Sequence, residues 1–255
     1  MKANPLRTAL ASGRLQLGTW INMVRAPAIL TLLKSAGLDY ARVDMEHSAP
    51  SIETIADMAV LARALDFPIL VRPPSADREW ITRLLDVGVW GLHIPQVDTP
   101  EIAREVVQAA RYAPAGRRGM AGIGPHNDFT PGVSLDELNA GVHITVMLES
   151  PQAFENIDEI ISTPGVDAVT LGPADLAQEL GIAGQPDQAA IIDGYRERMI
   201  ATAARHGKDV ALLCETRQEA ARWAAAGVRM IVLSSEVAVL HRTYAAMCAE
   251  LRDRQ

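Results

Sequence analysis

The chain has few cysteines, few aromatic residues and no excess of basic charge, and these shortages narrow the class of protein. Two cysteines in 255 residues, Cys214 and Cys248, make no disulfide framework and lack the spacing of metal ligands. We therefore expect reduced thiols in a cytoplasmic protein. The 24 Lys and Arg against 31 Asp and Glu, a net charge of −7, oppose the basic surface that nucleic acid or an anionic membrane requires. We expect neither as a partner.

Long apolar runs are also missing. The apolar run 58–65 is interrupted by Arg63 and is too short to span a bilayer, and the first seven residues lack the apolar core of a signal peptide. A chain of 255 residues with 49% hydrophobic content can bury one large core, although only 4% of its residues are aromatic. We expect one α/β domain over residues 1–255.

Short apolar runs alternate with amphipathic stretches, a pattern typical of parallel βα units. Eight strands are predicted, at 17–23, 40–46, 68–72, 91–97, 143–149, 167–172, 208–214 and 228–234. Helices are predicted at 27–36, 77–87, 99–112 and 216–226, and a long loop at 112–141. Eight such units in a chain of this length predict a single (β/α)₈ TIM barrel. An open doubly wound sheet is the alternative, although no Gly-x-Gly-x-x-Gly follows the first strand.

Polar residues close four of the predicted strands, where a barrel carries its active site. Asp44 and Glu46 share one face of the second strand and His47 follows at the rim, so a carboxylate could fix the imidazole tautomer. Arg72 ends the third strand and could neutralise an enolate or a carboxylate. The alternative for these residues is a set of structural ion pairs inside the barrel, which does not exclude a catalytic role.

Two further carboxylates close the fifth and sixth strands. Glu149 ends one, and Asp175 follows the other at the start of a helical stretch, with no His or Cys beside them. Such a pair suits Mg²⁺ or Mn²⁺, which keeps open positions for water and substrate, and the peptide N–H groups of Ala174 and Asp175 favour an anion at the same place. The alternative is a helix cap for Asp175 and a surface position for Glu149.

The order of motifs along the chain resembles the HpcH/HpaI aldolases, metal-dependent class II pyruvate aldolases of the phosphoenolpyruvate/pyruvate barrel superfamily. The resemblance covers almost the whole chain. It is carried by Gly18-Thr19-Trp20, Asp44-Met45-Glu46-His47, Val71-Arg72, Leu85-Asp86-Val87-Gly88, Arg111-Tyr112-Ala113-Pro114-Ala115-Gly116 and Gly172-Pro173-Ala174-Asp175-Leu176.

The resemblance implies a role for each site residue. Glu149 and Asp175 would bind a divalent ion, Mg²⁺ or Mn²⁺, with Co²⁺ and Zn²⁺ as further candidates. His47, oriented by Asp44, would act as acid and base, Arg72 would stabilise the enolate oxygen, and Asp86 would support the site across a subunit interface. The residues expected to contact the substrate are Trp20, Arg72, Met147, Gly172, Pro173, Ala174 and Asp175.

The reaction implied is reversible cleavage of a 4-hydroxy-2-oxo acid to pyruvate, or a close 2-oxo acid, and an aldehyde. Such an aldolase needs no Schiff-base lysine. The sequence is consistent with this, because its three lysines, Lys2, Lys34 and Lys208, lie away from the C-terminal ends of the predicted strands. Met147 stands where many relatives of the family have Gln, and Gln96 where they often have Met. Both positions lie beside the expected pocket, so the sequence does not identify the aldehyde. A CoA-ester lyase and a keto-acid-binding barrel without activity are the alternatives.

The last helix carries an apolar stripe that bears on the oligomeric state. Its members recur at helical spacing: Val237, Leu240, Tyr244, Met247, Cys248 and Leu251. The stripe could pack on its own barrel. The resemblance instead implies a homo-oligomer, a trimer or hexamer, whose barrel-end helices are exchanged between subunits.

Overall fold

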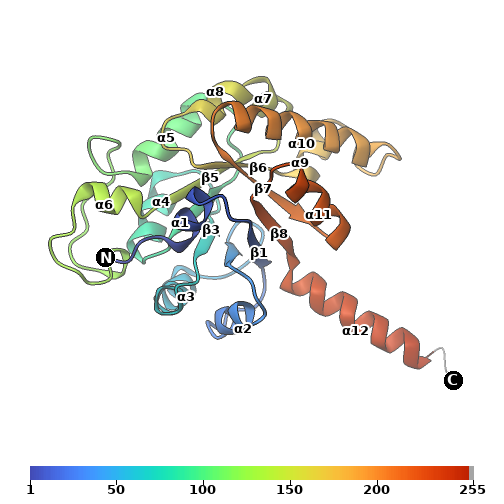
Figure 1. Ribbon diagram of the computed structural model, residues 1–255, viewed down its shortest axis with the longest axis horizontal. Coiled ribbons are helices and arrows are strands. Elements are labelled where there is room, and N and C mark those ends of the chain that lie inside the picture. The colour runs from blue at the N-terminus through green and yellow to red at the C-terminus, as the bar shows by residue number, and fades with distance from the viewer. Residues whose placement is uncertain (253–255) are drawn as a thin grey trace.

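The computed structural model describes residues 1–252, and these contain a closed barrel of eight parallel strands (Figure 1). Each strand pairs with the next along the chain, and β8 closes on β1. The strands are β1 (Gln16–Ile21), β2 (Tyr40–Asp44), β3 (Ile69–Arg72), β4 (Gly91–Ile94), β5 (His143–Leu148), β6 (Ala168–Leu171), β7 (Asp209–Cys214) and β8 (Met230–Ser235). The TIM barrel expected from the sequence is confirmed.

Helices surround the barrel and return the chain from each strand to the next. They are α1 (Pro5–Ala11), α2 (Ile29–Ser35), α3 (Ile52–Leu65), α4 (Arg78–Asp86), α5 (Pro100–Ala110), η1 (Pro125–Asn127), α6 (Leu135–Ala140), α7 (Pro151–Glu155), α8 (Ile157–Ser162), α9 (Pro173–Glu179), α10 (Gln188–Arg205), α11 (Arg217–Ala225) and α12 (Glu236–Arg252). None of the helices within residues 1–252 is long and apolar enough to cross a membrane. Cys214 is buried, Cys248 is exposed, and both are free thiols.

The N-terminal helix α1 joins the apolar cluster inside the barrel. Leu6 and Leu10 of α1 are almost fully buried. They belong to the same apolar cluster as Leu70 of β3 and Met230 of β8. A larger cluster lies between the strands and the outer helices. Burial of these two apolar layers stabilises the scaffold, so the strand ends are held in fixed positions.

Several expected boundaries were wrong by one to three residues, and two of the differences have clear local reasons. The second strand ends at Asp44 and not at residue 46, because Asp44 Oδ1 accepts the backbone N–H groups of Glu46 (3.0 Å) and His47 (3.4 Å) and turns the chain. The expected loop 112–141 contains the short helix α6, which Ser134 and Glu137 cap reciprocally.

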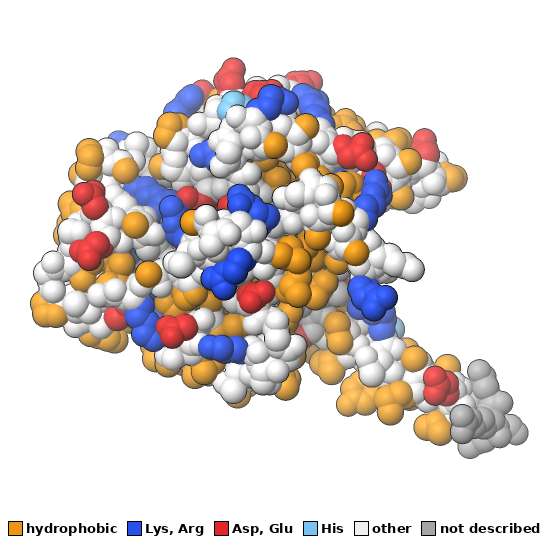
Figure 2. All heavy atoms as spheres, in the orientation of Figure 1, with side chains coloured by type: hydrophobic (Ala, Val, Ile, Leu, Met, Phe, Trp, Pro, Cys, Tyr) orange, Lys and Arg blue, Asp and Glu red, His pale blue; other side chains and the backbone are white. Residues whose placement is uncertain are grey.

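The last helix, α12, extends away from the barrel (Figure 1), and apolar side chains lie uncovered on its surface (Figure 2). Tyr244 and Leu251 are 62% and 66% exposed, and Leu240 and Met247 are also exposed. In a complete TIM barrel the last helix packs beside the first strand. Packing of this stripe on its own barrel, the alternative weighed above, is not what the chain does.

A buried histidine makes the stability of this scaffold depend on pH. Burial lowers the pKa of His143, the first residue of β5, to about 4, although Asp167 offsets part of the effect. At a pH between about 6.5, the pKa of histidine in the unfolded chain, and about 4, the unfolded chain binds a proton at His143 and the folded chain does not. Lowering the pH in this range therefore favours the unfolded chain. Stability should therefore fall by about 3 kcal/mol between pH 6.5 and pH 4 through this group.

Urea unfolding of His143→Gln from pH 7 to pH 4 tests that dependence. The variant should lose less stability than the wild type over this range, whereas His241→Gln, at an exposed position of α12, should behave as the wild type. Identical pH profiles for the wild type and His143→Gln would show that His143 does not cause the loss.

Candidate active site

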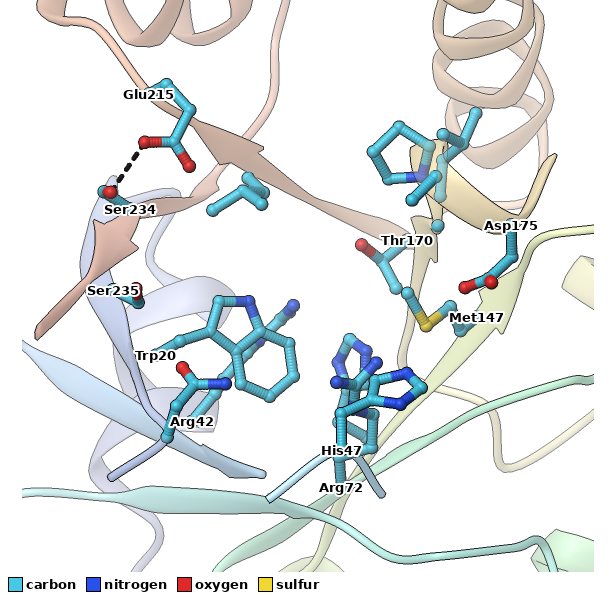
Figure 3. Close-up of a pocket in the computed structure, with 17 residues that line it drawn as sticks. Trp20, Arg42, His47, Arg72, Met147, Thr170, Asp175, Glu215, Ser234 and Ser235 are labelled. Atoms are coloured by element: carbon cyan, nitrogen blue, oxygen red, sulfur yellow. Dashed lines mark hydrogen bonds between the residues drawn. The ribbon is translucent and has the colours of Figure 1, made fainter. Parts of the chain in front are cut away.

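A cavity of about 300 Å³ opens at the C-terminal ends of the strands (Figure 3). Asp175 and Met147 lie on one side of it, and Glu215 and Ser234 lie on the other. His47, Arg72 and Trp20 line the space between them, as do Gly172, Pro173 and Ala174. The structure thus brings together most of the residues that the sequence predicted.

Arg72 holds two carboxylates at the edge of this cavity. Its Nε and Nη2 donate to the two oxygens of Asp44, each at 2.8 Å, and its Nη1 lies 3.0 Å from Glu46 Oε2. Asp44 is fully buried; burial alone would raise its pKa, but Arg72 lowers the pKa below its usual value. The structural ion pair considered as an alternative is therefore present, and it fixes the Arg72 guanidinium at the cavity wall.

The expectation that Asp44 orients the His47 ring was wrong. Asp44 reaches His47 only through the backbone N–H, and its oxygens are taken by Arg72. The carboxylate near the imidazole is Glu46, whose Oε2 lies 3.5 Å from His47 Nε2. Burial raises the pKa of Glu46, and Arg72 partly opposes the rise. Glu46 therefore links His47 to Arg72, and the His47 side chain, 59% exposed, can turn towards a ligand.

Glu149, like Asp44, is a buried carboxylate of the site. It is 4% exposed, and its Oε1 accepts the backbone N–H of Gln96 at 2.6 Å. Burial raises the pKa of Glu149 to about 7; the Gln96 hydrogen bond opposes this rise, and the charges of Glu46 and Asp175 add to it. Glu149 thus lies close to two other carboxylates, and a cation bound there would reduce the repulsion among the three negative charges.

Gly172 makes room for that carboxylate. A Cβ at this position would overlap Glu149 Oε2 and lie 2.8 Å from Met147 Cε. Register between β5 and β6 pairs Leu148 with Leu171, so Glu149 and Gly172 follow side by side. The sequence Gly172-Pro173-Ala174-Asp175 therefore brings Asp175 past the buried Glu149, where the two carboxylates repel each other.

The residues present fit a hard divalent ion better than a closed structural metal centre. Among residues 1–252 no group of three or more His, Cys, Asp and Glu side chains is placed to hold a metal. Glu149 and Asp175 offer two carboxylates, and Mg²⁺ typically takes one or two and keeps water or substrate on its other positions. The negative charges of Glu46 and Asp175 near the buried Glu149 would favour a cation at this place.

Asp86 does not join the other site residues within this chain. It is the last residue of α4, which runs back towards the N-terminal end of the barrel, and its Oδ1 accepts from Arg118 Nη2 at 2.6 Å. Its expected role across a subunit interface stays a prediction.

The cavity also has lining residues that were missed. Glu215, Ser234 and Ser235 follow or end β7 and β8, so the rule of polar strand ends would have found them. Arg42 and His93 lie deeper, inside the strands, and Arg42 precedes Asp44 on the same face. Only the alternation of side chains along β2 pointed to Arg42.

Comparison with known proteins places the chain in a family. The family model described as HpcH/HpaI aldolase/citrate lyase matches residues 16–241. A hydroxypyruvate/pyruvate aldolase of Deinococcus radiodurans is 34% identical over 100% of this chain and 93% of the relative. A 4-hydroxy-2-oxo-heptane-1,7-dioate aldolase of Escherichia coli is 31% identical over 96% of this chain and 94% of the relative.

A solved structure of the same family has the same fold as this chain. The crystal structure of an HpcH/HpaI aldolase from Desulfitobacterium hafniense DCB-2 superposes with a TM-score of 0.91, at 35% identity over 99% of this chain and 98% of that one. The chain therefore belongs to the HpcH/HpaI aldolase/citrate lyase family, and the family and the lyase activity expected from the sequence are confirmed.

Proposed function

We propose that the protein is a divalent-metal-dependent aldolase that cleaves or forms a 4-hydroxy-2-oxo acid from pyruvate, or a related 2-oxo acid, and an aldehyde. The observation that carries the proposal is the buried Glu149, with its pKa raised to about 7, beside Asp175 at the cavity wall. The names of the relatives support it, since both are aldolases of 2-oxo acids.

Glu149 and Asp175 are the residues that would hold the ion. Mg²⁺ or Mn²⁺ bound there would act as a Lewis acid on the ketone oxygen of the 2-oxo acid. Gly172, Pro173 and Ala174 line the same wall and would position the acid beside these carboxylates. Glu149 is buried, and its Oε1 accepts the Gln96 N–H, so the carboxylate is already held in one orientation. Little reorganisation of this group is then needed when substrate binds.

His47 and Arg72 would carry the proton and charge changes. In the cleavage direction a base removes the proton of the 4-hydroxyl, the C3–C4 bond breaks, the aldehyde leaves, and the electron pair moves to the ketone oxygen. Arg72, held by Asp44 and Glu46, would stabilise the charge on that oxygen. His47 Nε2, near Glu46, would take the proton and C3 would then be reprotonated.

Cleavage of 4-hydroxy-2-oxopentanoate tests the proposed function. Pyruvate release should require Mg²⁺ or Mn²⁺, stop with EDTA and return when metal is restored. His47→Ala should slow it by about 100-fold or more, the usual contribution of a general acid or base. Activity that EDTA leaves intact after dialysis would overturn the metal role.

The two alternatives are less well supported. A CoA-ester lyase needs cationic side chains for several CoA phosphates, whereas the cavity carries the carboxylates of Asp175 and Glu215, and its Arg72 is already paired with Asp44 and Glu46. A keto-acid-binding barrel without activity would bind metal and pyruvate but would not exchange the C3 protons. That outcome separates it from an aldolase.

The second part of the proposal is a homo-oligomer built through α12. An apolar groove of about 350 Å³ lies beside β1, β8 and α11 and is lined by Leu15, Leu17, Ala220, Ala224, Leu233 and Val239. A barrel helix would normally cover this position, while α12 extends from it with its stripe exposed. The stripe of α12 from a second copy has the chemistry to fill the groove.

Light scattering tests the oligomer. The wild type should have the mass of a trimer or hexamer, and Tyr244→Asp with Met247→Asp should shift the mass towards one chain, because two charges would enter an apolar contact. Glu250→Gln, an exposed polar change on the same helix, should leave the mass unchanged. A monomer mass for the wild type would contradict the proposal.

A further inference from the structure

The interior of the barrel contains buried polar atoms without a hydrogen-bond partner among the described residues, and two of the residues that carry them, Arg42 and His93, line the cavity. Tyr40 and Arg42 lie two residues apart on β2, and His93 lies on β4. The Tyr40 hydroxyl, Arg42 Nε and Nη2, and both ring nitrogens of His93 are buried without a hydrogen-bond partner among the described residues. Five such atoms inside one barrel are unusual, because buried polar atoms are nearly always paired.

Arg42 is the charged member of this group. Its side chain is 1% exposed, lines the cavity and has its Cζ 5.6 Å from the centre of the Trp20 ring. The Cζ of Arg72 lies 4.8 Å from the same ring. Burial lowers the pKa of Arg42, Tyr40 opposes this, and the positive charge of Arg72 lowers it further. Unlike Arg72, Arg42 is not one of the cations found in an ion pair within residues 1–252.

The neighbours of Arg42 do not compensate its charge. Burial, together with Arg42 and Arg72, holds the pKa of His93 well below its ordinary value, so the ring is neutral and does not add a second charge. Burial raises the pKa of Tyr40 to about 12, so its hydroxyl stays protonated. Water inside the cavity could satisfy hydrogen bonds but would leave an isolated guanidinium charge, which is costly in a buried site.

We propose that the cavity floor, formed by Arg42 with His93 and Trp20, binds a carboxylate group of the substrate. A guanidinium and a carboxylate form charge-assisted hydrogen bonds and match in charge. The subsite lies on the floor of the cavity whose wall carries Asp175, so one bound molecule can contact both. The identification of this carboxylate as part of a substrate rests on the proposed function; the binding of a carboxylate does not.

Two sources of the carboxylate are distinguished by the probes. Oxalate represents the 2-oxo acid, succinate represents an aldehyde partner that bears an acid group, and glyceraldehyde represents an uncharged partner. Each is titrated by calorimetry into the full-length protein in chloride-free buffer at constant ionic strength, once with Mg²⁺ and once with EDTA. The EDTA titrations need neither metal nor turnover, so their result is independent of the proposed aldolase activity.

Arg42→Met and Arg42→Lys are the variants, with Arg14→Met as an exposed control. Oxalate or succinate should bind the wild type in EDTA, at least about 10-fold more weakly to Arg42→Met, and with intermediate affinity to Arg42→Lys. Dependence on Arg42 for oxalate assigns the floor to the 2-oxo acid, and dependence for succinate alone assigns it to the aldehyde partner. Glyceraldehyde binding should not depend on Arg42.

Thermal unfolding separates binding from a structural role. Removing a buried charge that lacks a counter-ion should leave the unfolding temperature of Arg42→Met equal to or above that of the wild type. A variant that unfolds at a much lower temperature, or carboxylate binding that is equal in the wild type and Arg42→Met, would overturn the proposal and leave the floor as a site for water only.

Discussion

Arg72→Met is expected to lower kcat by about 100-fold or more and to destabilise the fold. The activity falls because the developing charge on the ketone oxygen loses its cationic partner. The stability falls because Asp44, fully buried, loses the two 2.8 Å hydrogen bonds that keep its charge satisfied. Leaving one partner of a buried pair alone typically costs about 3–5 kcal/mol. Steady-state kinetics and urea unfolding measure the two effects.

A second variant separates these effects. In Arg72→Met combined with Asp44→Asn, the buried charge is gone, so much of the lost stability should return. The activity should stay low, because no cation faces the ketone oxygen. Recovery of activity together with stability would show that Arg72 acts only through the ion pair and that another group stabilises the charge.

Glu149→Gln is expected to abolish metal-dependent turnover. The amide keeps the size of the side chain and can still accept the Gln96 N–H, but it removes the charge that would attract the ion. Loss of a ligand should weaken metal affinity by about 100-fold or more, since even the outer partners of metal ligands are worth about 10- to 100-fold. Calorimetric titration of Mn²⁺ into the protein without substrate measures this affinity.

The same variant has a second expected property. With EDTA present, Glu149→Gln should unfold at the wild-type temperature or above it, because the carboxylate it replaces is buried among Glu46 and Asp175. Glu155→Gln, an exposed change at the end of α7, is the control and should retain both metal affinity and turnover. Unchanged Mn²⁺ affinity in Glu149→Gln would show that the ion binds elsewhere.

The barrel could be predicted because its determinants are local. Alternating apolar runs set the strands, and the rule that function gathers at the C-terminal strand ends selected Arg72, Glu149 and Asp175. The seven-residue helix α9, with Asp175 in its first turn, lies where the sequence placed a helical start. Each of the eight predicted strands overlaps an observed strand, because each is marked by a short apolar run.

The pairing of side chains could not be predicted in the same way. Asp44, Glu46 and His47 lie within four residues, and the sequence does not state how these side chains pair with Arg72 and with one another. The turn after β2 decides that Arg72 pairs with both Asp44 and Glu46, and that Glu46 is the carboxylate near the His47 ring. Arg42 was missed for a related reason: it lies within a strand, and whether it meets a counter-ion depends on residues far along the chain; within residues 1–252 its Nε and Nη2 have no partner.

We expect this cavity to remove a proton from C3 of a 2-oxo acid with the help of a divalent ion. Proton NMR of pyruvate in D₂O, with the purified protein and Mg²⁺, follows this step at the methyl group. We expect the methyl signal to decay with Mg²⁺, to persist with EDTA, and to decay far more slowly with His47→Ala or Glu149→Gln. A methyl signal that persists with both Mg²⁺ and Mn²⁺ would show that the protein does not remove this proton, and would favour the keto-acid-binding barrel.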